Sequence, residues 1–318
     1  MNYGIPSDFR RSLIALGILA LAANLVGGAR CSAEESKPQS LAAPITKGQR
    51  VFTAGHSFHV FVYPMLAEMA KSAGIADHEM AGISRIGGSR VIQHWNVADE
   101  KNEAKAALRA GKVDVLTLSP IWLPDAGIAN FAKLAVEHNP KVRIMVQEYW
   151  LPNDTYEPIY PLDTRKKVDH NATNLAELRK SNDAYCRDIE KEVRGLNKEL
   201  GRDAVFVVPV GEASIALREK IVAGQAPGLK AQWDLFRDTW GHAKSPLMVL
   251  SGYCHFAVIY RRNPEGLAVP TALQKDESIA EGDKEKLNHL LQEIAWKTVC
   301  HHPLTGMQTE TAAARPAP

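Results

Sequence analysis

The sequence predicts an α/β fold of three layers, with helices on both faces of a mostly parallel sheet of five strands. From residue 50 onward, short apolar runs alternate with longer amphipathic stretches, which is the pattern of strands alternating with helices. Several runs are apolar almost throughout, as in Val-Asp-Val-Leu-Thr-Leu at 113–118. Runs of this kind suit strands that are covered on both faces of a sheet.

The expected elements follow one another in a single domain at residues 49–302. Strands are expected at 50–54, 80–84, 113–118, 142–147 and 204–210. Apolar residues three and four positions apart predict helices at 60–73, 89–110, 126–138 and 173–200. The segment 151–170 carries prolines, aromatic residues and a basic cluster at 165–167, and it is long for a connection. Two interpretations of this segment stay open, a functional lid and a decoration.

Composition and charge exclude several classes of protein. An apolar content of 45% over 318 residues is enough to bury a core, so general disorder is excluded. The chain has 38 Lys and Arg against 36 Asp and Glu, a formal charge of +2. This balance gives no strong field to attract a polyanion, and we expect no nucleic-acid partner.

The first residues have the order of a secretory signal. Arg10 and Arg11 precede an apolar run at 13–26, and small residues follow as far as Ala33. The run is shorter than the roughly 20 residues of a membrane span. We therefore expect a signal peptide at 1–33, export to the periplasm or the exterior, and contact with a membrane only during export. A linker is expected at 34–48 and a disordered tail at 303–318.

The cysteines leave two arrangements open. Cys31 leaves with the signal, so Cys186, Cys254 and Cys300 remain. This odd number allows one disulfide and one thiol, or three thiols. Cys254 with Cys300 is the pair to test first, because both lie in the last third of the chain.

The first expected strand passes into a helix through Gly55, His56 and Ser57. Ligands bind at the carboxyl ends of strands in open α/β sheets, where the next helix also points its free N–H groups. Two roles for Ser57 are compatible with this place. It could be a nucleophile whose own N–H helps to hold an oxyanion, or it could cap the helix.

A serine nucleophile needs a base, and the candidates lie late in the chain. Asp238 and His242 are four residues apart in a segment that contains Gly241. One short loop could therefore supply an imidazole base and the carboxylate that orients it. Asp and His at this spacing also occur on ordinary helix surfaces, so the pair gains meaning only together with Ser57.

The order of Ser57, Asp238 and His242 resembles the SGNH (GDSL-like) hydrolase superfamily. The residues at 55–58 are similar to its first block, Gly-x-Ser. Ile-Gly-Gly-Ser at 86–89 is similar to its second block. The last block is usually Asp-x-x-His, and here it is one residue longer. The resemblance covers about residues 50–262 and implies a flavodoxin-like SGNH hydrolase fold.

This resemblance implies an ester hydrolase with Ser57 as nucleophile, His242 as base and Asp238 as the orienting acid. The oxyanion hole would contain the N–H groups of Ser57 and Gly88. The family also places an asparagine just after the third strand, where this chain has Ser119. Either the Ser119 hydroxyl replaces that asparagine, or Asn153 folds back, or the hole lacks one donor.

The resemblance and the expected export imply a small-molecule or glycan ester as substrate, such as a carbohydrate O-acetyl or short acyl ester. The alternative is a non-catalytic or weakly active carbohydrate-binding protein that uses Trp95, Trp122, Trp150 and Trp240 as stacking surfaces. No cofactor is expected, because no dinucleotide or phosphate loop is present.

No metal site is expected either. His56, His59, His94 and the pair at 301–302 do not form a metal-binding motif, and the last two stand beside Pro303 at an end expected to fray. Cys254 and His255 are neighbours in an apolar helix, where adjacent side chains point apart, so packing explains them better than a Cys-His nucleophile. The oligomeric state stays open.

Overall fold

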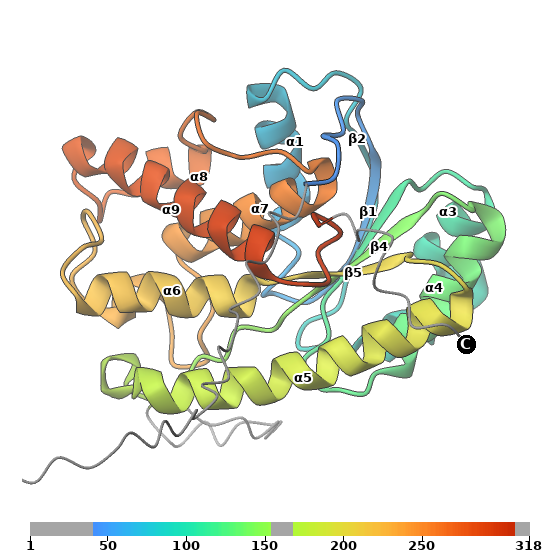
Figure 1. Ribbon diagram of the computed structural model, residues 1–318, viewed down its shortest axis with the longest axis horizontal. Coiled ribbons are helices and arrows are strands. Elements are labelled where there is room, and N and C mark those ends of the chain that lie inside the picture. The colour runs from blue at the N-terminus through green and yellow to red at the C-terminus, as the bar shows by residue number, and fades with distance from the viewer. Residues whose placement is uncertain (1–40, 154–167, 309–318) are drawn as a thin grey trace, which may run out of the picture. The chain divides into compact units, whose positions relative to one another are not determined.

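The computed structural model describes residues 41–153 and 168–308. Its centre is a sheet of five parallel strands in the order β2-β1-β3-β4-β5. Helices cover both faces of this sheet (Figure 1). The predicted three-layer α/β fold is therefore confirmed. In this order the chain reverses direction between β1 and β3, and ligands bind at such a switch point in open α/β sheets.

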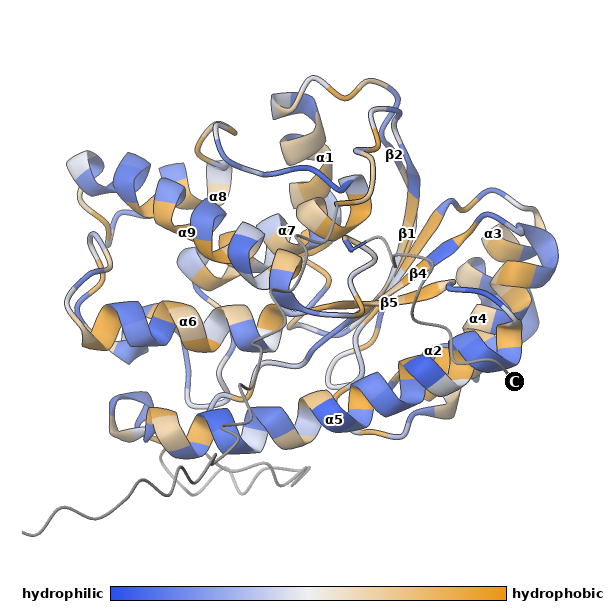
Figure 2. Cartoon of the chain, viewed as in Figure 1, coloured by the Kyte–Doolittle hydropathy of each residue, from blue (hydrophilic) through white to orange (hydrophobic). Residues whose placement is uncertain are grey.

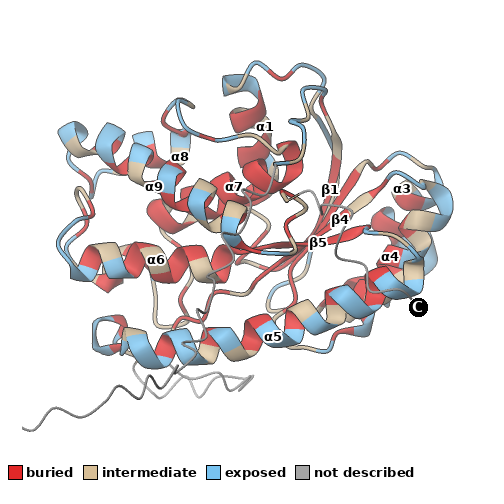
Figure 3. Cartoon of the chain, viewed as in Figure 1, coloured by how far each residue is buried: buried red, intermediate tan, exposed pale blue. Residues whose placement is uncertain are grey.

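The strands lie close to their expected positions. They are β1 (Arg50–Gly55), β2 (Glu79–Arg85), β3 (Val115–Leu118), β4 (Arg143–Gln147) and β5 (Val205–Val208). The last strand is shorter than expected because Pro209 precedes a helix that begins at Val210. β1, β3, β4 and β5 are mostly buried, whereas β2 at the edge is partly exposed (Figure 3).

One face of the sheet is covered by helices that pack around a largely apolar helix. This helix is α7 (Ser245–Tyr260), which is buried along nearly its whole length. Packed around it are α1 (Val62–Ser72), α6 (Val210–Val222), α8 (Thr271–Gln274) and α9 (Glu281–His301). Figure 2 shows α9 with hydrophilic and hydrophobic residues alternating along its length. The sequence analysis did not anticipate α6, α8 or α9, and α7 was expected only as an apolar helix around Cys254 and His255.

The other face carries four α-helices of the described chain and one short 3-10 turn. They are α2 (Val91–Trp95), η1 (Asp99–Lys101), α3 (Glu103–Arg109), α4 (Ala126–His138) and α5 (Leu175–Leu200). The single helix expected at 89–110 is wrong, because the chain there divides into α2, η1 and α3. The Asn102 side chain causes the second break: it accepts a bond from the Lys105 N–H and so caps α3. Two further 3-10 turns are η2 (His170–Ala172) and η3 (Gln232–Leu235).

The domain includes more residues at each end of the sequence than expected. Residues 41–153 and 168–308 belong to one compact unit. Leu41 forms an antiparallel bridge with Gln308, and the Ile45 N–H bonds the Tyr260 carbonyl. Met307 is fully buried. The tail expected from 303 is therefore wrong as far as 308, because these residues pack on the domain. The expected signal at 1–33 and the remaining tail lie outside the described residues.

Cys186, Cys254 and Cys300 are all free thiols. The Cys254–Cys300 disulfide, offered as the pair to test first, is therefore wrong, and the arrangement of three thiols holds. Burial raises the pKa of Cys186 and Cys254, which keeps both protonated. No described helix combines the length and apolar content that crossing a membrane requires.

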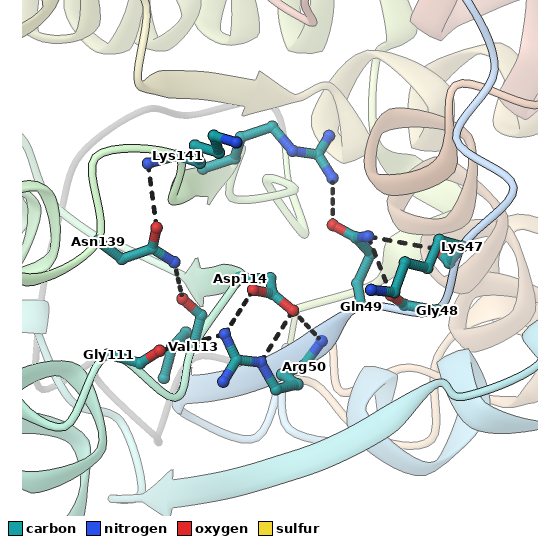
Figure 4. Close-up of polar contacts among 10 residues, drawn as sticks. Lys47, Gly48, Gln49, Arg50, Gly111, Val113, Asp114, Asn139 and Lys141 are labelled. Atoms are coloured by element: carbon teal, nitrogen blue, oxygen red, sulfur yellow. Dashed lines mark hydrogen bonds and ion pairs between the residues drawn. The ribbon is translucent and has the colours of Figure 1, made fainter.

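Charged and polar side chains connect the amino-terminal ends of the strands, which together form the amino edge of the sheet. Arg50 begins β1 and makes a bidentate ion pair with Asp114, with distances of 2.7 and 3.0 Å (Figure 4). Asp114 is the residue just before β3. Arg143 begins β4 and donates to the Ile259 carbonyl at 2.8 Å and to the Gln49 side chain at 3.2 Å. The Asn139 amide bonds the Val113 carbonyl at 2.8 Å. These contacts tie the strand starts to each other and to α7.

Candidate active site

Ser57 lies in the turn that joins β1 to α1. The helix begins five residues later, at Val62, and no side chain caps it. The capping role considered for Ser57 is therefore wrong. Instead, the Ser57 Oγ lies 2.9 Å from the Nε2 of His242. The structure thus brings a hydroxyl at the carboxyl end of β1 against an imidazole from 185 residues further along the chain.

His242 and Asp238 lie in one tight loop. The His242 Nδ1 is 2.8 Å from the Asp238 Oδ2, and the Asp238 Oδ1 accepts the N–H groups of Trp240 and His242. The strand-like ends of the loop pair at Phe236 and Ala243. Within it the Gly241 N–H bonds the Asp238 carbonyl at 3.2 Å, forming a turn. This turn accommodates the extra residue between Asp238 and His242.

Ser57, His242 and Asp238 therefore form a continuous chain of hydrogen bonds. A carboxylate at Nδ1 requires an N–H there, which leaves the Nε2 lone pair facing the Ser57 hydroxyl. The side chains of His242 and Asp238 remain 25% and 35% exposed. The arrangement can remove the serine proton, and a ligand can reach it from solvent.

Aromatic packing holds the nucleophile turn against the acid-base loop. The Phe58 ring stacks on Trp150, with centroids 4.5 Å apart, and stands edge-on to His242 at 5.1 Å. The Trp150 Nε1–H donates to the Gly241 carbonyl at 3.1 Å. Gly241 has a φ of +84°, and a Cβ there would meet Pro152 at 2.3 Å, so only glycine fits. Ser57 and His242 are thus fixed through their chain neighbours.

Gly88 lies in the turn after β2, the strand beside β1. Its φ of +57° favours glycine. His94 holds this turn, because its two ring nitrogens each lie 2.7 Å from a hydroxyl, that of Ser84 and that of Ser89. Within 41–153 and 168–308, neither the Ser57 N–H nor the Gly88 N–H has an acceptor. Both backbone donors predicted for the oxyanion hole are therefore available to a ligand.

The two alternatives for a third donor differ in their surroundings. Ser119 directly follows β3 and is 1% exposed. Its Oγ lies 3.2 Å from the His56 Nε2 and 3.5 Å from the Gln147 Nε2, so it is tied to the nucleophile turn. Asn153 follows Pro152 and is the last residue before the part that is not described. The described contacts place Ser119 beside the nucleophile turn.

Buried neutral side chains hold the nucleophile turn in place through hydrogen bonds. Gln147 ends β4, and its amide nitrogen donates to the Phe58 carbonyl at 3.1 Å. Its oxygen accepts the His59 Nδ1–H at 2.8 Å, and the His59 Nε2 lies 2.9 Å from the Thr117 hydroxyl. Burial lowers the pKa of His59 to about 4. The side chains of Gln147, His59 and Thr117 therefore form a neutral hydrogen-bonded network that joins β3 and β4 to the nucleophile turn.

His170 and Arg218 are positioning residues that the sequence analysis missed. The ring nitrogens of His170 lie 2.9 Å from the Asp238 carbonyl and 3.0 Å from the Pro152 carbonyl. The fully buried Arg218 donates to the carbonyls of Leu151, Pro152 and His170. Together they fix both ends of the segment 151–170 beside the acid-base loop. Nothing local in the sequence marks His170, since its partner is 68 residues away.

The other candidates have structural roles. His255 donates its Nδ1–H to the Ser251 carbonyl, one turn earlier in α7, and is fully buried. Trp150 is also fully buried and cannot stack on a sugar. His302 is 3% exposed, so the fraying expected there is wrong. Across the described ranges, no group of three or more His, Cys, Asp or Glu side chains could hold a metal ion.

No protein-family model matches the chain, and no curated protein matches it. Among solved structures it is similar to a DUF4886 family protein from Bacteroides uniformis, with 16% identity and a TM-score of 0.50, over 82% of this chain and all of that one. An extracellular lipase from Streptomyces rimosus aligns with 13% identity and a TM-score of 0.29, over 52% of this chain and 83% of that one. The first comparison supports the α/β fold.

Proposed function

We propose that this chain is an exported serine hydrolase of the SGNH type that cleaves a carboxylic ester. The observation that carries the proposal is the chain of hydrogen bonds from Ser57 through His242 to Asp238, with distances of 2.9 and 2.8 Å. These residues come from two distant segments, and their donors and acceptors alternate as general-base catalysis requires. The N–H groups of Ser57 and Gly88 lie at the same edge of the sheet, and no acceptor for them is found among the described residues, which adds to this support.

The reaction would proceed in two similar halves. The Ser57 Oγ attacks the ester carbonyl carbon while His242 takes its proton, and Asp238 stabilises the imidazolium. The carbonyl oxygen becomes an anion and accepts bonds from the Ser57 and Gly88 N–H groups and from a third donor, Ser119 or Asn153. Collapse expels the alcohol, which receives the proton from His242. Water then attacks the acyl-enzyme in the same way and releases the carboxylic acid.

The substrate class comes from the family resemblance and from the signal-like first residues. We propose an O-acetyl or short acyl ester, carried by a carbohydrate or a small molecule. Export is testable by itself, because secreted protein should begin at residue 34 by mass spectrometry of the intact chain.

Hydrolysis of p-nitrophenyl acetate and of acetylated glycans tests the proposal. The Ser57→Ala variant should lose a factor of about 10⁴ or more in kcat/KM. Ser72→Ala is a matched control, because Ser72 ends α1 and its hydroxyl only accepts the Ala268 N–H. Equal rates for wild type and Ser57→Ala would overturn the proposal. Glycan binding without any hydrolysis would establish the binding-protein alternative instead.

A further inference from the structure

We infer that His56 is a positioning residue whose neutral imidazole directs the Ser119 hydroxyl proton toward the oxyanion of the reaction. The inference rests on the proposed function and deepens it, because it assigns the third donor of the oxyanion hole and the residue that orients it. It is carried by the hydrogen bonds of the His56, Gln147 and Ser119 side chains.

The tautomer of His56 follows from its neighbours. The Phe58 N–H donates to the His56 Nδ1 at 3.2 Å, so this nitrogen carries a lone pair. His56 is 2% exposed, and burial, together with the nearby histidines, lowers its pKa to about 3. The ring is therefore neutral, and its single proton is on Nε2. That Nε2–H faces Ser119, whose Oγ lies 3.2 Å away and whose backbone also takes part in a hydrogen bond with the ring.

Gln147 supplies a second donor to the same hydroxyl. Its Oε1 faces the His59 Nδ1 and its Nε2 faces the Phe58 carbonyl, which fixes the orientation of the amide. The remaining Nε2 hydrogen points to the Ser119 Oγ at 3.5 Å. A hydroxyl oxygen has two lone pairs, and both now receive a donor. The Ser119 proton must therefore point away from His56 and Gln147.

The remaining direction lies at the edge of the sheet that carries the nucleophile. Leu118 pairs with Ala54 and Arg85 pairs with Gly55, so the ends of β2, β1 and β3 lie side by side. Gly88, Ser57 and Ser119 follow these three strands in turn. Among the described residues no acceptor takes the Ser119 proton. A developing oxyanion between Gly88 and Ser57 would be that acceptor.

Two substitutions of His56 separate this role from simple support of the turn. In His56→Gln the amide nitrogen can occupy the place of Nε2 and still donate to Ser119. In His56→Asn the shorter amide can occupy the place of Nδ1 and still accept from Phe58. If His56 acts through Ser119, the Asn variant loses at least tenfold in kcat, and the Gln variant stays within about threefold of wild type. If His56 only supports the turn, this order reverses.

Substitutions of Ser119 complete the test with p-nitrophenyl acetate. Ser119→Ala should lower kcat by about 10² to 10³ with little change in KM, and Ser119→Thr, which keeps a hydroxyl, should retain most of the rate. A trifluoromethyl ketone, which adds to Ser57 as a tetrahedral oxyanion, should bind more weakly to Ser119→Ala by a similar factor. The double variant His56→Asn/Ser119→Ala should be no slower than Ser119→Ala alone.

The outcomes are distinct. Full activity of Ser119→Ala, additive effects in the double variant, or a reversed order of the two His56 variants overturns the inference and leaves the proposed function standing. A wild type without Ser57-dependent hydrolysis overturns both. Because the two His56 variants retain Ser119, their comparison still decides the matter if Ser119→Ala does not fold.

Discussion

The two edges of the same parallel sheet hold their polar groups in opposite ways. At the amino edge, Arg50 and Arg143 keep their charges, because the Asp114 carboxylate pairs with the partly exposed Arg50, and amide and carbonyl oxygens accept from Arg143. At the carboxyl edge, His56, His59 and His94 are neutral, because burial lowers the pKa of each to between about 3 and about 4. Hydroxyl groups and one amide are the side-chain partners of these rings.

This difference shows how neutral side chains can hold a site rigid without disfavouring the charge that forms during its reaction. A buried cation near His242 would disfavour the imidazolium that forms when Ser57 loses its proton. Neutral histidines give the turn fixed hydrogen bonds without that repulsion. The amino edge has no such restriction, so charged pairs can join its strands.

The largest expected effect comes from the acid-base loop. Asp238→Asn should lower kcat by about 10⁴, because an amide no longer fixes the reactive tautomer of His242 or stabilises its charged form. The fold should tolerate the change, since an amide oxygen can still accept the N–H groups of Trp240 and His242. Stopped assays with p-nitrophenyl acetate measure the loss. A rate within tenfold of wild type would remove Asp238 from the mechanism.

The neutral histidines should make the fold sensitive to acid. Burial lowers the folded pKa values of His56, His59, His94, His255 and His302 below the ordinary value of 6.5, so the unfolded chain binds more protons at these rings and their contribution to stability falls as pH drops below about 6.5. Burial raises the pKa of Glu148 and Glu192, and these two carboxyls contribute in the opposite direction. Each ring contributes about 1.4 kcal/mol per pH unit over this window. Urea unfolding at pH 7, 6 and 5 measures the slope.

His255→Phe provides the control for this slope. It removes one of the buried titrating rings while keeping an aromatic side chain in α7. The slope should decrease by about 1.4 kcal/mol per pH unit, the contribution of one buried ring. An unchanged slope would show that buried histidines do not set the acid limit.

His170→Phe should give a smaller effect on the same site. The ring can still pack near Trp233 and Phe236, but the N–H that His170 offers to the carbonyls of Pro152 and Asp238 is lost. We expect kcat to fall by about 10- to 100-fold through displacement of Asp238. His170→Gln, which keeps an N–H donor, should recover part of the rate. If both variants equal wild type, the acid-base loop is held without His170.

The smallest effect should come from the amino edge. Asp114→Asn weakens a pair whose side chains are 35% and 32% exposed, so the cost should be only about 1 kcal/mol of unfolding free energy. The midpoint temperature of thermal unfolding should fall by a few degrees, and kcat should not change. A marked loss of activity would show that the two edges of the sheet are coupled.

The sequence predicted the sheet better than the helices. Apolar runs located all five strands, and four of these are mostly buried, where parallel strands are apolar on both faces. The helix expected at 89–110 failed because Asn102 caps a new helix in the middle of an amphipathic pattern. Helices α6 and α9 were missed. Buried polar residues such as Arg218, Asn288 and Gln292 interrupt their apolar stripes, and only tertiary contacts explain those residues.

At the site, the sequence predicted residues but not their partners. Ser57, Asp238 and His242 were found from local patterns and Gly88 through the family resemblance, and the structure places the first three in one chain of hydrogen bonds. Gln147, His170 and the role of His94 depend on contacts across the sheet or between distant loops. A polar residue at the end of an apolar strand, as at Gln147, is the signal that could have been used.

Covalent labelling of Ser57 tests the central claim most directly. A fluorophosphonate reacts with a serine that a base has activated, and peptide mapping by mass spectrometry identifies the serine that carries the phosphonyl group. We predict labelling of Ser57 in the wild-type protein, with a rate at least about 10²-fold lower in His242→Ala. Absence of label on Ser57, or equal rates in the two proteins, would contradict the account.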